Sequence, residues 1–159
     1  MEKLRQSLKT GAELVGSFWF LVMFGAFIVQ VFTRYVLNHP FGWTTEMSLI
    51  GFLWFAFWGG GLMVRERDHV RFDLIYQMVS PKARRIMTFI VTLVLGGVFA
   101  YALPANVDYV MFMAHDRTWV MGIRFDLVFA VFVVFLVAVC ARNLWRAYRV
   151  TRADWRDIL

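Results

Sequence analysis

Four long runs of apolar residues, separated by short polar stretches, dominate the chain. They extend over about residues 11–32, 45–64, 86–107 and 123–141. An α-helix needs about 20 mainly apolar residues, at about 1.5 Å rise each, to cross the hydrocarbon core of a bilayer. The pattern therefore predicts an all-α membrane protein with four transmembrane helices, arranged as a single membrane domain over residues 1–159.

Residues that break or cap helices mark the ends of these runs. Pro40 and Gly42 cannot comfortably continue a helix, so residues 38–42 are expected to form a turn after the first span. Ser80 followed by Pro81 is typical of an N-cap and a first helical residue, and predicts the start of the third helix. Thr44 is expected to cap the second helix and to place Glu46 in its first turn.

Three further segments, at about residues 1–10, 69–79 and 142–156, have apolar residues on one side and polar or basic residues on the other. Helices of this kind lie in the membrane interface. We expect interfacial amphipathic helices that anchor the protein; the alternative is that one of them packs on a partner. The residues expected to contact membrane lipids are Arg67, Arg71, Trp145, Arg146 and Arg149.

Basic residues are unevenly divided between the two predicted sides of the membrane. Fourteen lie in the N-terminal segment, residues 65–85 and the segment after the fourth span, and only Arg34, Arg117 and Arg124 lie on the other side. Cytoplasmic loops of membrane proteins carry the excess of Lys and Arg. We therefore predict that the N and C termini are cytoplasmic and that the turns at residues 33–44 and 108–122 face outward.

The amino-acid composition is that of a membrane protein and argues against a small soluble domain or a nucleic-acid-binding protein. Hydrophobic residues make up 60% of the 159 residues, more than a small soluble domain can bury. The net charge of +6 would suggest nucleic-acid binding in a soluble protein. Here the basic residues lie between apolar runs, so no nucleic acid is expected. A single cysteine, Cys140, excludes an intramolecular disulfide.

Candidate residues for catalysis or ion transfer are few. The middles of the predicted spans contain no ionisable residue, which argues against a self-sufficient transporter. Glu46, at the outer end of the second span, has three interpretations: an acid favoured by a helix N-terminus, a conformational or partner contact, or the proton-coupling carboxylate of a small exporter. All three histidines lie outside the spans, which disfavours haem. We expect no enzyme activity, no metal and no cofactor.

Small residues predict where helices approach each other closely. Residues 59–61 are three consecutive glycines in the second span, and Gly96 and Ala100 form a small-residue face on the third. Such faces let neighbouring backbones pack closely in membranes. We expect them to serve packing within the four helices.

Several short motifs occur in order between Arg34 and Arg85. Arg34-Tyr35 follows the first span, and Trp43 and Glu46 open the second. The segment after the glycines reads Val64-Arg65-Glu66-Arg67-Asp68-His69-Val70-Arg71-Phe72-Asp73-Leu74. In this order and spacing the motifs resemble the small membrane subunit, the Q-type or DctQ-like subunit, of tripartite ATP-independent periplasmic (TRAP) transporters. Many members have two adjacent acids where this chain has Glu46 alone.

The resemblance implies a non-catalytic scaffold subunit in the bacterial inner membrane. Its partners would be a large multi-span membrane subunit, which carries the substrate and sodium sites, and a periplasmic substrate-binding protein, which usually delivers an organic acid. The small subunit would support the large one and help dock the binding protein. The residues on the family pattern, expected to hold the fold and the subunit contact, are Arg34, Trp43, Glu46, Arg65, His69 and Asp73.

Two other functions stay open from the sequence. One is a membrane anchor for a redox enzyme that holds haem or quinone. The other is a free-standing small proton-coupled exporter that works as a homodimer and uses Glu46.

Overall fold

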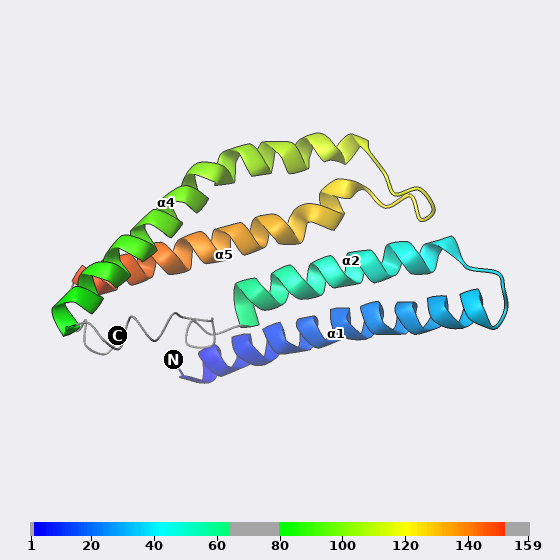
Figure 1. Ribbon diagram of the computed structural model, residues 1–159, viewed down its shortest axis with the longest axis horizontal. Helices are drawn as coiled ribbons and strands as arrows, with labels where there is room; N and C mark the ends of the chain where they lie inside the picture. The colour runs from blue at the N-terminus through cyan, green and yellow to red at the C-terminus, as the bar shows by residue number, and fades with distance from the viewer. Residues whose placement is uncertain (1, 64–79, 152–159) are drawn as a thin grey trace. The chain divides into compact units, whose positions relative to one another are not determined.

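The computed structural model describes residues 2–63 and 80–151, which are mainly helical. In chain order the elements are α1 (Glu2–Tyr35), α2 (Gly42–Trp58), the π-helical turn η1 (Gly59–Met63), α4 (Pro81–Phe112), the 3₁₀ turn η2 (Met113–His115) and α5 (Phe125–Thr151) (Figure 1). Four stretches are long and apolar enough to cross a membrane: Lys9–Tyr35, Gly42–Met63, Lys82–His115 and Phe125–Thr151. The prediction of four spanning helices is confirmed.

Two of the predicted amphipathic segments are continuous with spanning helices. α1 already includes Glu2, and α5 continues without a break through Thr151. The polar residues there therefore form the ends of long helices. The third segment, residues 69–79, lies outside the described residues. The side of the membrane on which each end lies stays a prediction.

The chain divides into two compact units, which we describe separately. The first unit comprises Met1–Val64 and Asn106–Phe135, and the second comprises Arg65–Ala105 and Leu136–Leu159. α4 and α5 each contribute residues to both units. The single membrane domain expected from the sequence stays a prediction.

In the first unit, α1 and α2 are antiparallel neighbours joined by a short turn (Figure 1). A Cβ atom added at Gly51 would lie 3.0 Å from the backbone N and Cα of Met23, so the two helices meet at this glycine with almost no space between them. The rings of Trp19 and Trp54 stack at 4.9 Å between centroids. The indole N–H of Trp58 donates to the Ala12 carbonyl at 3.0 Å. A close backbone approach and satisfied polar groups are what membrane helix packing requires.

The end of α2 packs against the first part of α5 in the same unit. The Phe57 ring lies 5.1 Å from that of Phe132 and 5.4 Å from that of Phe135. A Cβ atom at Gly61 would lie 3.3 Å from the Phe135 Cα. The predicted close contact at the three glycines is therefore confirmed for this one, and its partner is α5.

In the second unit, α4 and α5 pack around Gly96. A Cβ atom there would lie 3.1 Å from the Leu144 side chain and 3.3 Å from that of Asn143. The buried Thr92 hydroxyl donates to the Thr88 carbonyl at 2.7 Å, which satisfies a polar group within the helix. Gly96 therefore serves the predicted helix contact, whereas Ala100 on the same predicted face is exposed.

Of the two predicted helix starts, the one for α4 is confirmed and the one for α2 is wrong. α4 begins at Pro81, and the Ser80 hydroxyl oxygen accepts the Ala83 N–H at 3.4 Å, as expected for an N-cap. The prediction for α2 is wrong, because this helix begins at Gly42, before Thr44. Thr44 lies inside the first turn, fully buried, and its hydroxyl donates to the Phe41 carbonyl at 2.6 Å. A threonine can satisfy its hydroxyl on a nearby carbonyl instead of capping.

Candidate functional site

The Glu46 carboxylate connects the start of α2 to the loop between η2 and α5. Its Oε1 accepts the Val120 N–H at 2.8 Å, and its Oε2 accepts the Met121 N–H at 2.9 Å. Hydrogen bonds to an ionised acceptor are stronger than those between neutral groups. The structure thus joins the two turns that the sequence places on the same side of the membrane. Of the three interpretations of Glu46, the conformational contact is the one that this geometry favours.

The loop that Glu46 holds, residues 116–124, is itself ordered by hydrogen bonds. Thr118 N–H donates to the Ile123 carbonyl at 2.8 Å, and the Thr118 hydroxyl accepts the Ile123 N–H at 3.0 Å. Arg117 and Arg124 form an antiparallel β-bridge. Gly122 adopts φ +66°, a conformation that glycine reaches without the steric penalty of a side chain. The loop is therefore a tight reversal of the chain.

Outside the reversal, an ion pair ties the end of this loop to α5. The Arg124 guanidinium donates to both carboxylate oxygens of Asp126, with the shorter distance 2.6 Å. This two-point geometry is the favourable one for arginine and a carboxylate. Asp126 also lies in the first turn of α5, where the helix dipole favours an acid. The loop thus has a second attachment besides Glu46.

The tip of this loop consists of Trp119, Val120 and Met121, and it presents large apolar side chains to the surroundings. Trp119 is 97% exposed, and Val120 and Met121 are exposed as well. A Cβ atom at Gly42 would lie 3.0 Å from a Val120 methyl group, so the start of α2 packs directly under the tip. Both the carboxylate of Glu46 and this contact hold the tip in place. An exposed tryptophan on a loop whose backbone is held in place is a feature of recognition sites more than of solvated loops.

The other predicted site residues are spread over the chain. Arg34 lies at the end of α1, with its guanidinium 5.9 Å from the centroid of the Tyr35 ring. Trp43 lies in the first turn of α2 and is 42% exposed. The residues predicted from the family pattern or as lipid contacts that fall outside the described part of the chain are Arg65, Arg67, His69, Arg71 and Asp73.

The predicted lipid-contacting residues near the end of α5 lie in the part of the chain that the structure describes. Trp145 is 63% exposed, and its ring lies 5.9 Å from that of Tyr148. Arg149 is exposed, whereas the Nε atom of Arg146 is buried. Their contact with lipid stays a prediction.

Sequence reasoning missed the partners of Glu46. Val120 and Met121 contribute backbone N–H groups, which every residue except proline carries, so no side-chain pattern marks them. Two signals were nevertheless present in the sequence. Gly122 indicates a turn, and three consecutive large apolar residues precede it in a segment predicted to lie outside the spans.

Comparisons with known proteins agree with the resemblance in the sequence. Residues 23–153 match the family model for the DctQ component of tripartite ATP-independent periplasmic transporters. The chain is also similar to the sialic acid TRAP transporter permease protein SiaT of Haemophilus influenzae (strain 86-028NP), with 29% identity over 90 residues. That match covers 56% of this chain and 15% of the relative.

Proposed function

The chain belongs to the family of DctQ components of TRAP transporters, and on this premise we propose that it is the small scaffold subunit of a sodium-coupled, binding-protein-dependent transporter. It is a multi-pass protein of the bacterial inner membrane. In this role the chain carries no substrate site of its own. It supports a larger membrane subunit and helps dock the periplasmic binding protein.

The proposed docking role is supported mainly by the hydrogen bonds between the loop tip and Glu46. Both carboxylate oxygens accept hydrogen bonds from consecutive backbone N–H groups of the tip, at 2.8 and 2.9 Å, while the Trp119 side chain stays 97% exposed. A loop whose backbone is already held in place loses little conformational entropy on binding. Tryptophan is also among the residues that contribute most to protein interfaces. We propose that the tip contacts the binding protein.

The supporting role rests on the exposed apolar surface of the spanning helices. Leu14, Leu21 and Phe27 on α1 are each more than half exposed, as are Ile90 and Val98 on α4. Extended apolar surface of this kind is covered by lipid or by a membrane partner. The relative SiaT matches over only 15% of its length, which leaves room in that protein for a much larger component. We propose that a component of that size covers part of this surface.

The proposed substrate is an organic acid that carries a carboxylate, moved together with sodium by the large subunit. The relative is a transporter of sialic acid by its name, and this name supports the organic-acid class. We do not propose that the chain is a proton-coupled exporter. Both Glu46 oxygens accept hydrogen bonds from the loop, and this arrangement suits a structural role better than proton transfer.

A reconstituted uptake assay tests the docking role. The chain, its large subunit and the loaded binding protein are combined in proteoliposomes, with and without an inward sodium gradient. Trp119→Ala should raise the half-saturating concentration of binding protein about tenfold, as expected for loss of an important interface residue. Uptake at saturating binding protein should change little, and no uptake should occur without sodium.

The matched control is Trp145→Ala, which removes a 63%-exposed tryptophan near the other end of α5. It should leave the half-saturating concentration unchanged. If Trp119→Ala also leaves it unchanged, or if the two variants have the same effect, the tip does not dock the binding protein. Uptake that is indifferent to sodium would contradict the proposed coupling.

A further inference from the structure

The net charge of the protein lies entirely in the second unit. The first unit, Met1–Val64 and Asn106–Phe135, contains six basic and six acidic residues, whereas the second unit contains eleven basic and five acidic residues. Over the described residues of the second unit, 80–105 and 136–151, the sequence has six Lys and Arg and no Asp or Glu. The described part of this unit is therefore strongly basic in sequence.

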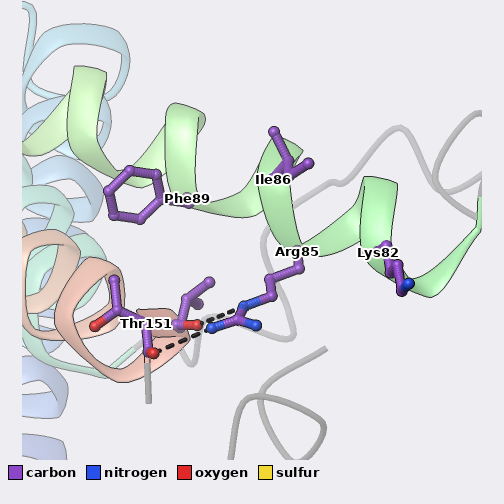
Figure 2. A pocket seen from close by; sticks show the side chains of 6 residues that line it. Lys82, Arg85, Ile86, Phe89 and Thr151 are labelled. Carbon is purple, nitrogen blue, oxygen red and sulfur yellow. Dashed lines mark hydrogen bonds between the residues drawn. The ribbon is translucent and has the colours of Figure 1, made fainter. Parts of the chain in front are cut away.

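An open cavity of about 440 Å³ lies in this unit between the start of α4 and the end of α5. Its lining residues are Lys82, Arg85, Ile86, Phe89, Val150 and Thr151 (Figure 2). The four residues from α4 occur at spacings of three, four and seven, so they lie on one face of that helix. The face begins with two basic residues and continues with two apolar ones in the direction of the span.

Arg85 is fixed at this cavity by the end of α5. Its Nε donates to the Val150 carbonyl at 3.0 Å, and one of its terminal nitrogens donates to the Thr151 carbonyl at 3.0 Å (Figure 2). These are carbonyls of the last helical turn, which carries partial negative charge. These two bonds set the position of the guanidinium at the cavity, and Lys82 lies one turn nearer to the start of α4.

We infer that this cavity binds one anionic phospholipid, with the headgroup phosphate at Lys82 and Arg85 and an acyl chain along Ile86 and Phe89. Basic pockets between membrane helices bind anionic lipid headgroups. The cavity surface is mainly apolar, which a free phosphate ion could not use but an acyl chain can. The change from charged to apolar lining along one helix face matches the change from headgroup to acyl chain along a lipid.

The inference is tested on the purified full chain in neutral detergent and does not depend on the proposed transport role. Native mass spectrometry measures the dissociation constants of dioleoyl-phosphatidylglycerol and dioleoyl-phosphatidylcholine. The wild type should prefer phosphatidylglycerol. Lys82→Ala should weaken phosphatidylglycerol about fivefold, the effect of one basic residue at a membrane surface, and Lys82→Arg should restore it. Ile86→Ser should weaken both lipids.

Two matched controls separate this site from general lipid binding. Lys9→Ala removes an exposed basic residue of the first unit, and Ile90→Ser changes a 53%-exposed residue of α4 outside the cavity lining. Neither should change the affinity for phosphatidylglycerol. Equal binding of the two lipids by the wild type, or an equal loss in Lys82→Ala and Lys9→Ala, would overturn the site. Displacement of the lipid by inorganic phosphate would show a free-anion site instead.

Discussion

At the scale of single residues, the clearest structural feature of the protein is the carboxylate of Glu46, which accepts hydrogen bonds from backbone N–H groups. Glu46 is fixed at the start of α2, and its two oxygens accept consecutive N–H groups of Val120 and Met121. The amides of a short loop tip have no partner within regular structure, and a carboxylate can satisfy both of them. One side chain thereby determines the position of the loop backbone next to Trp119.

This leads to a prediction for Glu46→Gln. The amide side chain has one oxygen acceptor, and its NH₂ group would face an N–H donor. Loss of a charge-assisted bond at an exposed site should increase hydrogen exchange at Val120 and Met121 by about three- to tenfold. Hydrogen–deuterium exchange followed by mass spectrometry of peptides from residues 113–124 measures the change.

The control for this prediction is Glu13→Gln, which makes the same chemical change at an exposed position on α1. It should leave exchange in residues 113–124 at the wild-type rate. If Glu46→Gln protects the loop as well as the wild type does, the carboxylate does not hold the tip.

At the scale of elements, the helix contacts differ in how much an added methyl group would disturb them. At Gly51 the opposing atoms belong to the backbone of Met23, which cannot rotate away, at 3.0 Å. At Gly96 they belong to the side chains of Asn143 and Leu144, at 3.1 to 3.3 Å. At Gly25 and Gly97 no atom lies within 4 Å of the added Cβ. The first contact is therefore more rigid than the second, and the last two positions are open.

Alanine substitutions at these glycines should follow the same order. Gly51→Ala should lower the free energy of unfolding by about 1–3 kcal/mol, because overpacking a rigid contact displaces a helix. Gly96→Ala should lower it less. Gly25→Ala and Gly97→Ala should raise it slightly, by up to about 1 kcal/mol, since alanine favours helix. Unfolding in mixed micelles, followed by circular dichroism, measures all four. Equal effects at Gly51 and Gly25 would contradict the contact described between α1 and α2.

The elements also show which features a sequence can reveal. The four spans follow from apolar length alone, because crossing a bilayer imposes a minimum number of apolar residues. The turn around Pro40 and the start of α4 follow from residues with strong local preferences, Pro40, Ser80 and Pro81. Gly42, which was expected in this turn, is instead the first residue of α2. Thr44 was assigned wrongly as a cap because its hydroxyl had a second available partner, the Phe41 carbonyl.

Features that depend on the meeting of distant segments could not be predicted in detail. The sequence singled out Glu46 but not its partners, because these are backbone amides 74 and 75 residues away. It likewise gave no sign that Arg85 would bond to the carbonyls of Val150 and Thr151. Side-chain patterns identify residue types, and the fold decides which backbone groups they meet.

At the scale of the whole molecule, charge is expected to set orientation. The fourteen basic residues of the terminal and 65–85 segments predict a cytoplasmic location for both termini and an outward location for the loop tip. In a Cys140→Ser background, W119C should react with a membrane-impermeant maleimide in intact spheroplasts. R152C should react only after lysis. The reverse labelling would contradict the orientation on which the docking proposal depends.

The central claim is that this member of the DctQ component family works as the small subunit of a larger membrane complex. The most direct measurement is co-purification of the C-terminally tagged chain from native membranes in mild detergent, followed by mass spectrometry. The account predicts a stoichiometric, much larger multi-span membrane protein in the purified sample. Recovery of the chain alone, or with a soluble redox protein and a Soret absorption band, would contradict it.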